Sequence, residues 1–316
     1  GLSFMNEVLY VAASARLPIV LAVACRALTG PININHDYSD SMAERDSGFI
    51  QIYAENNQEA YDNYLMAHRI GETPDVRLPV MICEDGFITS HALENIELEE
   101  DEAVKAFVGE YHPENYLLKH ENPLAVGPYG TSPYYMEARV AQAEAMKNAK
   151  WAILDVAADF EKTFGRKYGL FEAYRMEDAE LAIVLMGSSA GTAKAAVDEL
   201  RESGVKAGLI KIRVFRPFPG EELAEALKNC KAVAVLDKSE GFSACGGPLF
   251  AETASACINL PQRPKMVDIV YGLGGRDFTV AQAKRVFARL EKIVSTGEVG
   301  PIYSHMGQRD LREDVQ

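Results

Sequence analysis

The sequence has few of the features that would build a membrane span, a disulfide framework or a metal cluster. None of its apolar runs reaches the roughly 18 to 20 residues that a transmembrane helix needs. Its cysteines are odd in number, lie far apart and include no Cys-x-x-Cys pair: Cys25, Cys83, Cys230, Cys245 and Cys257. Such spacing is typical of reduced, mostly buried thiols in a cytoplasmic protein. It disfavours zinc, and it leaves too few grouped thiolates for this chain to hold an iron–sulfur cluster alone.

Basic residues are also scarce, and their scarcity is uneven. The chain has 32 Lys and Arg against 46 Asp and Glu, a formal charge of −14. Residues 1–150 hold 10 basic and 23 acidic side chains, whereas residues 151–316 hold 22 and 23. Nucleic acids and anionic membranes bind clustered Lys and Arg, so neither is expected as a main partner. The 316 residues, 48% of them hydrophobic, suffice for two domains with separate cores.

The first hundred residues alternate between helical and strand patterns. Apolar residues at one-face helical spacing predict a helix over 3–15, and the continuous apolar run 18–25 is typical of a strand buried on both faces. Two further apolar runs, 49–53 and 78–83, flank a helical pattern over 58–70. This alternation predicts a parallel sheet with helices on both sides.

The middle of the chain interrupts this alternation, and the second half restores it. Residues 109–135 contain four Pro and three Gly, which indicates a connecting arm laid over a surface, and a long helix is expected from Tyr135 to about Phe164. After Glu180 we expect strands at 181–186, 207–214, 232–236 and 266–271, alternating with helices at 190–203, 221–229, 248–258 and 279–294. The prediction is an α/β protein with two doubly wound, mostly parallel-sheet domains, at 1–165 and 166–298, and a polar, irregular tail at 299–316.

One short motif suggests a hydrolase. Gly187-Ser-Ser-Ala-Gly191 matches G-x-S-x-G between a strand and a helix, which would make Ser189 a nucleophile. That chemistry needs a histidine base, and His305, in the polar tail, is the only histidine that follows. The alternative is a tight strand-to-helix turn with Ser at the N-cap and Gly at a close backbone approach, and we favour it.

The polar loop over 26–48 is the more promising region. Asp37, Asp40, Glu44 and Asp46 surround Arg45 in the sequence, in the half of the chain that has few basic residues. The loop could be a solvated surface in which these carboxylates pair with the arginine. They could instead orient a guanidinium whose free edge binds a substrate carboxylate. A metal site built from His36, Asp37 and Asp40 is a weaker option, because all three lie in one loop.

Three other polar segments lie near predicted strand ends. Gly272-Leu-Gly-Gly-Arg-Asp277 could cradle a phosphate but completes no known phosphate motif, so a structural turn is favoured. The segment 239–247 could contact a partner domain. His91 could act as an acid or base, although such a histidine more often hydrogen-bonds a loop. The acidic run 94–102 is interpreted as a solvated surface turn.

Taken together, nine segments resemble one family. They are Leu17-Pro-Ile-Val, Arg26-Ala-Leu, Gly30-Pro-Ile-Asn, Asp37-x-x-Asp40, Ala43-x-Arg45-Asp-x-Gly48, Asn57-Gln-Glu-Ala60, Asp85-Gly-Phe-x-x-Ser-His91, Arg213-Val-Phe-Arg-Pro-Phe-Pro219 and Gly272-Leu-Gly-Gly-Arg-Asp277. In this order they resemble the alpha part of the pyruvate:ferredoxin oxidoreductases, which are thiamine-diphosphate-dependent 2-oxoacid oxidoreductases. The resemblance covers nearly the whole chain.

The resemblance implies a pyrimidine-binding thiamine domain followed by a transketolase C-terminal-like domain. It implies oxidative cleavage of pyruvate to acetyl-CoA and CO₂, with electrons passed through [4Fe-4S] clusters to ferredoxin. Thiamine diphosphate would be shared with a partner, and the clusters and coenzyme A would belong to the complete complex. The implied partners are beta, gamma and ferredoxin-like delta subunits or equivalent domains, in a dimer of multi-subunit units. At the family's arginine position, Arg45 would fix the pyruvate carboxylate over the cofactor's thiazolium carbon, with Asp37 and Asp40 orienting the loop.

Two family residues have no counterpart here. The threonine that contacts substrate and the glutamate that activates the thiamine pyrimidine both precede the segment where this sequence starts, at Gly1. The sequence therefore suggests that the first part of the first domain is missing or lies on another chain, and that this chain alone is inactive. Three alternatives stay open: another small 2-oxoacid as substrate, a serine hydrolase acting through Ser189, and a non-catalytic assembly subunit.

Overall fold

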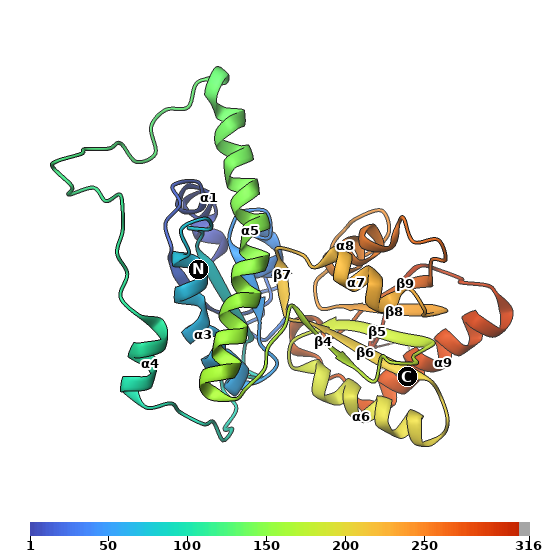
Figure 1. Ribbon diagram of the computed structural model, residues 1–316. Coiled ribbons are helices and arrows are strands. Elements are labelled where there is room, and N and C mark those ends of the chain that lie inside the picture. The colour runs from blue at the N-terminus through green and yellow to red at the C-terminus, as the bar shows by residue number, and fades with distance from the viewer. Residues whose placement is uncertain (310–316) are drawn as a thin grey trace.

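The computed structural model describes residues 1–309 and contains two α/β units that lie side by side (Figure 1). The first unit has a four-stranded sheet in the order β1-β3-β2-β7. Its strands are β1 (Val20–Cys25), β2 (Ile50–Tyr53), β3 (Val80–Asp85) and β7 (Val214–Arg216). Its helices are α1 (Asn6–Ser14), preceded by the 3₁₀ turn η1 (Ser3–Met5), α2 (Ser39–Ala43), α3 (Asn57–Glu72), α4 (Asp101–Val108) and α5 (Ser132–Phe164).

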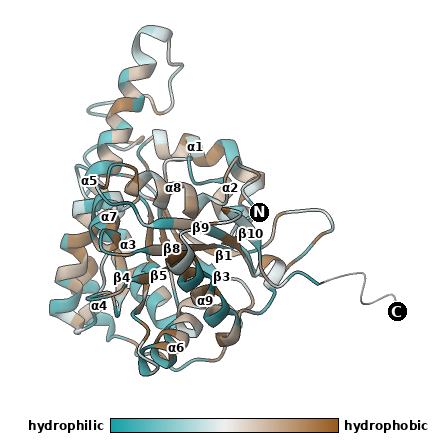
Figure 2. Ribbon diagram, turned by 90° about the vertical axis from the view of Figure 1, so that its right-hand side faces the viewer, coloured by the Kyte–Doolittle hydropathy of each residue, from teal (hydrophilic) through white to brown (hydrophobic). Residues whose placement is uncertain are grey.

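The second unit has a six-stranded sheet in the order β10-β9-β8-β5-β6-β4, in which only β4 is antiparallel to its neighbour. Its strands are β4 (Phe171–Tyr174), β5 (Leu181–Met186), β6 (Ala207–Ile212), β8 (Ala232–Asp237), β9 (Lys265–Val270) and β10 (Tyr303–His305). Its helices are α6 (Ser189–Glu202), α7 (Gly220–Leu227), α8 (Pro248–Cys257), the 3₁₀ turn η2 (Leu273–Gly275) and α9 (Val280–Thr296). The central strands are hydrophobic, and the helices around them mix hydrophobic and hydrophilic residues (Figure 2). The α/β prediction with two mostly parallel sheets is confirmed.

The predicted strand at 18–25 forms, but it is not buried on both faces. β1 is an edge strand that pairs only with β3, and Ala22 is exposed on it. The central strands β2 and β3 are buried almost throughout. Apolar composition alone therefore could not separate an edge strand from a central one.

The predicted strand at 207–214 is in fact two strands that belong to different sheets. β6 ends at Ile212, and after Arg213 the chain enters β7, which pairs antiparallel with β2 of the first unit. The second half of the chain thus supplies the last strand of the first sheet. This crossing fixes the two units against each other.

The arm between α4 and α5 differs from the prediction. Residues 109–131 are almost entirely exposed and extend away from the rest of the chain, to the projecting end of α5 (Figure 1). The acidic run 94–102 is not wholly solvated either, since Glu99 pairs with Arg166 and the run leads into α4. No helix in the described residues is both long enough and apolar enough to cross a membrane.

The segment predicted as an irregular tail contributes a strand. β10 pairs with β9 in parallel and widens the second sheet. Residues 310–316 of that predicted tail lie outside the described residues.

Candidate active site

A cleft of about 890 Å³ opens where the two units meet. The first unit lines it with the loop that follows β1 and with α2. The second unit lines it with residues 239–247 after β8 and with the turn after β9. Ligands of parallel α/β sheets bind outside the carboxyl ends of the strands, and both sheets present those ends here. The cleft is therefore the candidate active site.

Arg45 lies in this cleft, just after α2. Its Nη1 donates to the carbonyl oxygen of Met42 at 2.8 Å, and its Nε lies 3.8 Å from a carboxylate oxygen of Asp46. The side chain is 41% exposed. A guanidinium has five N–H donors, so most of them remain available to a ligand.

The four acids expected around Arg45 do not gather on it. Within the described chain, Asp46 is the one that forms an ion pair with Arg45, whereas the buried Glu44 accepts a hydrogen bond from Asn6. Asp37 accepts from the backbone amides of Ser39 at 2.9 Å and Gly274 at 3.1 Å. It therefore ties the loop to the second unit.

Asp40 fixes the start of the same loop. Its carboxylate accepts from the backbone amides of Arg26 at 2.9 Å and Ser41 at 2.7 Å. Burial raises the pKa of Asp40 to about 6, although these two amides oppose the shift. Both Asp37 and Asp40 thus act on the backbone and not on the guanidinium.

The glycine turn over 272–275 packs directly on the cleft loop. The amide of Gly275 donates to the carbonyl of His36 at 2.6 Å. A Cβ atom on Gly274 would lie 2.3 Å from Asn33, so the close approach requires glycine there. This geometry fits a structural turn better than a phosphate cradle.

A second group of polar residues lies next to the cleft; the sequence had offered one of them, His36, as a metal ligand but did not reveal the group. Asp85, at the end of β3, is fully buried and accepts from the Tyr38 hydroxyl at 2.6 Å and from Lys238 Nζ at 3.0 Å. The Ser188 hydroxyl and amide also donate to it, at 2.5 and 3.2 Å. We call this group the Asp85 cluster; its members are His36, Tyr38, Asp85, Ser188 and Lys238.

The charges of the Asp85 cluster are set by burial and by pairing. Burial alone would raise the pKa of Asp85, but Lys238 and His36 hold it well below its usual range. His36 Nε2 lies 3.2 Å from Asp85 and its Nδ1 lies 3.4 Å from the carbonyl of Cys25. Both neighbours accept hydrogen bonds, so a neutral ring can donate to only one of them. Burial lowers the pKa of His36 to about 4. The nearby Asp85 carboxylate favours the protonated ring and would raise this pKa, but the effect of burial is larger.

The metal site considered for His36, Asp37 and Asp40 has no converging ligands. His36 turns inward to Asp85, whereas Asp37 and Asp40 bind backbone amides, so the three do not meet. Over residues 1–309, no three His, Cys, Asp or Glu side chains are placed to hold a metal ion. Of the thiols, Cys245 is exposed and the other four are buried.

The G-x-S-x-G segment lies in the contact between the two units, where Ser188 hydrogen-bonds Asp85. Gly187 has φ = 69°, and a Cβ atom there would lie 1.8 Å from the Tyr38 hydroxyl. Ser188 takes the N-cap position of α6, but its hydroxyl donates to Asp85 and accepts no hydrogen bond from the amides of the helix. Ser189 is only 5% exposed, and no histidine within the described chain hydrogen-bonds it.

The remaining histidines expected near the site lie elsewhere. His91 stacks on Phe87 with ring centroids 4.3 Å apart and hydrogen-bonds Ser90. His305 binds the carboxylate of Glu240 at 2.8 Å, which ties β10 to the loop after β8. The His91 contact matches the expectation that this histidine hydrogen-bonds a loop, and His305, the one candidate base for Ser189, is bound to Glu240 instead.

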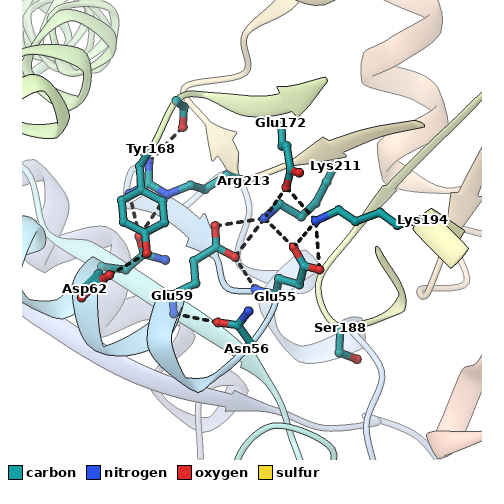
Figure 3. A network of polar contacts seen from close by, with 12 residues as sticks. Glu55, Asn56, Glu59, Asp62, Tyr168, Glu172, Ser188, Lys194, Lys211 and Arg213 are labelled. Carbon is teal, nitrogen blue, oxygen red and sulfur yellow. Dashed lines mark hydrogen bonds and ion pairs between the residues drawn. The ribbon is translucent and has the colours of Figure 1, made fainter. Parts of the chain in front are cut away.

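A third group joins the units on the other side of the interface (Figure 3). Lys211 of β6 is buried and lies 2.8 Å from Glu55, 3.1 Å from Glu59 and 3.2 Å from Glu172. Lys194 of α6 binds Glu55 and Glu172 at 3.0 and 2.9 Å. Burial alone would lower the pKa of Lys211, but Glu59 and Glu55 raise it above its ordinary value. We call Glu55, Glu59, Glu172, Lys194 and Lys211 the Lys211 cluster.

Two family models match this chain. Residues 1–158 match "Pyruvate flavodoxin/ferredoxin oxidoreductase, thiamine diP-bdg", and residues 179–283 match "Pyruvate:ferredoxin oxidoreductase core domain II". The first matched range lies in the first unit, and the second covers most of the second unit together with β7; β4, β10 and most of α9 lie outside it.

Curated relatives agree with this assignment. Pyruvate synthase subunit PorA of Thermotoga maritima is 52% identical over 287 residues, which are 91% of this chain and 73% of that protein. PorA of Pyrococcus furiosus is 43% identical over 98% of this chain and 78% of its own. Ketoisovalerate oxidoreductase subunit VorA of Pyrococcus horikoshii is 43% identical over 95% of this chain and 75% of its own.

A solved structure shows the same fold. It is a 2-oxoglutarate:ferredoxin oxidoreductase from Magnetococcus marinus with 2-oxoglutarate, coenzyme A and succinyl-CoA bound. It superimposes with a TM-score of 0.59 at 16% identity, over 92% of this chain and 51% of that one. Matching family models, close relatives and a shared fold lead to one conclusion: this chain belongs to the pyruvate:ferredoxin oxidoreductase family, in which it is an alpha-subunit homologue.

Proposed function

We propose that this chain is the subunit of a pyruvate:ferredoxin oxidoreductase that binds the substrate carboxylate. The enzyme would convert pyruvate and coenzyme A to acetyl-CoA and CO₂ with ferredoxin as electron acceptor. The single observation that supports the role most directly is Arg45, a half-exposed guanidinium with free donors in the cleft between the units. The pyruvate synthase names of the relatives support the reaction.

Arg45 is suited to hold a carboxylate in a fixed place. The bond from Nη1 to Met42 anchors its side chain at one edge, so the other edge can present two parallel N–H donors. Asp37 and Asp40 hold the loop backbone before and at the start of α2. In this proposal they are positioning residues that keep the guanidinium in the cleft.

The cleft fits part of a thiamine cofactor better than the whole of it. Leu28, Ile32 and Phe242 offer apolar surface for an aromatic ring. The charged side chains of the lining are four carboxylates (Asp37, Asp46, Glu240 and Glu252) and two guanidinium groups (Arg45 and Arg216), and this net negative charge disfavours a diphosphate. When bound, thiamine diphosphate supplies a carbanion that attacks the keto carbon and accepts the electrons left by CO₂. We propose that a partner domain holds its diphosphate and that this chain supplies the face next to the substrate.

Membership of the family also suggests which partners complete the enzyme. Beta, gamma and delta subunits or equivalent domains would hold the [4Fe-4S] clusters and coenzyme A, in a dimer of multi-subunit units. The domain bounds 1–165, 166–298 and 299–316 stay an interpretation, with β7 crossing from the second range to the first sheet. A cytoplasmic location is supported by the free thiols.

The substrate could also be another small 2-oxoacid. The VorA relative, named for ketoisovalerate, is as similar to this chain as one of the PorA relatives, so overall identity does not choose between acyl groups. The carboxylate and keto group are common to all such substrates, and Arg45 would bind either. Steady-state assays of the assembled enzyme with pyruvate and with ketoisovalerate separate the two.

The test of the carboxylate role is Arg45→Ala in the assembled enzyme. Losing the guanidinium leaves the substrate carboxylate uncompensated, so kcat/KM for pyruvate should fall by about 30- to 5,000-fold, equivalent to roughly 2–5 kcal/mol. Arg175→Gln, which removes an exposed pair with Asp198, is the matched control and should keep full activity. An unchanged kcat/KM in Arg45→Ala would refute the role.

A non-catalytic assembly subunit is the rival interpretation. In that case Arg45→Ala would leave turnover unchanged, and removal of this chain would disrupt the complex without removing a substrate contact. Co-elution of the purified protein with thiamine diphosphate, iron and a second polypeptide is common to both interpretations. Only the kinetic effect of Arg45→Ala separates them.

A further inference from the structure

A second arginine in the cleft comes from the other half of the chain. Arg216 is the last residue of β7, and in the sheet it lies opposite Gln51 of β2. This pairing places its side chain beside the turn that holds Arg45. The side chain is only 16% exposed.

Arg216 binds the backbone next to the substrate arginine. Its Nε donates to the carbonyl oxygen of Arg45 at 3.1 Å. Its Nη2 lies 3.4 Å from Asp46 and 2.7 Å from Glu252 of α8, and its Nη1 donates to the carbonyl of Phe215 at 3.1 Å. One planar guanidinium therefore joins the Arg45 turn, β7 and α8.

These contacts argue against a direct role for Arg216 on the substrate. Each of its three nitrogens already has a partner in the described chain, and the carboxylates of Asp46 and Glu252 offset its charge. Arg45, by contrast, has one hydrogen bond and one long ion-pair contact. The two arginines of the cleft thus differ in kind. Arg45 has most of its donors free, whereas every nitrogen of Arg216 has at least one partner.

The Arg45 turn has few other ties to hold it. The amide of Arg45 lies 3.4 Å from the carbonyl of Met42, at the long end of a hydrogen bond. The other bonds belong to Glu44, whose amide donates to Ser41 at 3.2 Å, whose carbonyl accepts from Ser47 at 3.1 Å and whose carboxylate accepts from Asn6 at 2.8 Å. Asp37 and Asp40 act several residues upstream. The carbonyl of Arg45 is held from the second unit by Arg216, whose fork-shaped donor set a lysine could not reproduce.

We propose that Arg216 is a positioning residue that sets the affinity of the site for the substrate carboxylate by fixing the backbone of Arg45 from the second unit. This inference rests on the proposed role of Arg45. It makes the binding of a 2-oxoacid depend on the contact between the two units. Loss of Arg216 would leave the Arg45 guanidinium present but free to sample positions outside the productive one.

The experiment is a double-mutant cycle in the assembled enzyme with Arg45→Ala, Arg216→Gln and the double variant. Arg45→Ala removes the side chain but keeps the carbonyl that Arg216 binds. Any contribution of Arg216 to the stability of the fold is therefore the same with and without Arg45→Ala. Its contribution to pyruvate binding through the Arg45 guanidinium is absent in the Arg45→Ala background. The measurements are KM and kcat for pyruvate, KM for coenzyme A and the melting temperature.

We expect Arg216→Gln to affect KM for pyruvate much more than kcat or KM for coenzyme A. Arg216→Gln should raise KM for pyruvate by about 5- to 30-fold with a change in kcat below about threefold, and KM for coenzyme A should stay within about twofold. Arg216→Lys, which keeps the charge but not the fork, should recover less than half of that loss on a logarithmic scale. In the Arg45→Ala background, Arg216→Gln should change KM by less than about twofold.

Each other outcome has a distinct meaning. If Arg45→Ala leaves pyruvate kinetics unchanged, the proposed function itself fails. If Arg45→Ala is defective but Arg216→Gln lowers only the melting temperature, or raises KM equally in both backgrounds, the positioning role is overturned and the proposed function stands. Arg175→Gln serves again as the unaffected control.

Discussion

Two buried polar clusters join the same two units, and they differ in how their buried charges are compensated. The Asp85 cluster surrounds one carboxylate with one lysine, two hydroxyls, a backbone amide and a histidine. The Lys211 cluster interleaves two ammonium groups with three carboxylates. The Asp85 cluster thus contains one fully buried ion pair, between Asp85 and Lys238, whereas the Lys211 cluster is a network of several ion pairs.

Burial separates the two clusters as much as composition does. In the Asp85 cluster Asp85 and Lys238 are 0% and 3% exposed, so neither charge can turn to water if its partner is removed. In the Lys211 cluster Lys194 and Glu172 are 22% and 40% exposed, so part of that network is already hydrated. Removing one partner of a single, fully buried ion pair should therefore lower the stability strongly. In a partly hydrated network, water and the remaining charges can compensate for a lost partner, so the effect should be smaller.

The largest effect is expected from Lys238→Met, which would remove the lone cation of the Asp85 cluster. The carboxylate of Asp85 would stay buried with only neutral donors around it, so the free energy of unfolding of the full chain should fall by about 3–5 kcal/mol. Urea unfolding measures this loss. The matched control is Asp85→Asn combined with Lys238→Met, which removes both charges and should regain about half; a single-variant loss below about 1 kcal/mol would contradict the comparison.

The next effect is a pH dependence that belongs to the Asp85 cluster. Because the folded protein holds the pKa of His36 at about 4, below the ordinary 6.5, the unfolded chain binds a proton that the folded chain does not between these values. Stability from the neutral ring is therefore complete above about pH 6.5 and is lost as the pH falls towards 4, by about 3 kcal/mol at most. His36→Asn should remove this slope from urea titrations at pH 4 to 7.

Asp85 marks the lower end of that pH profile. Its pKa lies well below its usual range, so the stability it contributes is present above about pH 4 and is lost only in more acidic solution. The two residues should therefore give two separate steps. Equal slopes for the wild type and His36→Asn between pH 4 and 7 would show that the ring does not titrate as described.

A smaller loss is expected when the Lys211 cluster is broken at its centre. Lys211→Met would remove three ion-pair contacts, but Lys194 would still pair with Glu55 and Glu172. Only Glu59, 5% exposed, would lose its cation outright. We expect a loss of about 2 kcal/mol in urea unfolding, less than for Lys238→Met. A loss greater than that of Lys238→Met would invert the comparison.

The smallest effect should come from Lys194→Met. This lysine is partly hydrated, and Lys211 would still lie within 3.2 Å of both of its carboxylate partners. A change below about 1 kcal/mol is expected, as for other partly exposed pairs. Differential scanning calorimetry at 0.1 and 0.5 M salt should show that this small term weakens with ionic strength, while the loss in Lys238→Met does not.

Local patterns in the sequence predicted most of the fold. The strands and helices from β5 to α9 follow their predicted positions within a few residues, because apolar periodicity there reflects burial directly. β7 was missed because residues 207–214 form one unbroken strand-like pattern, and no local signal says that the chain changes sheets after Ile212. Pairing partners far apart in sequence are decided by packing and not by propensity.

The site was predictable only in part, for a related reason. Arg45 was one of two open interpretations of its acidic loop until the resemblance favoured it as the carboxylate-binding residue, and that role stays a prediction. Asp85, Ser188 and Lys238 each lie at or just after the end of a parallel strand, which was a usable signal that they meet at one edge. What could not be predicted is that the edges of two different sheets face each other. Arg216 was quoted only as part of a family motif, and its bond to Arg45 appears only once β7 is in place.

The crossing of β7 also has a consequence for how the protein is made. The partner of β2 in the first sheet lies 165 positions later in the chain, at Arg216 opposite Gln51. During synthesis, the first unit leaves the ribosome with an open edge on β2 long before the strand that covers it exists. Translation speed over the intervening residues, and any chaperone that shields that edge, would therefore govern the yield of native protein as much as the stability of either unit.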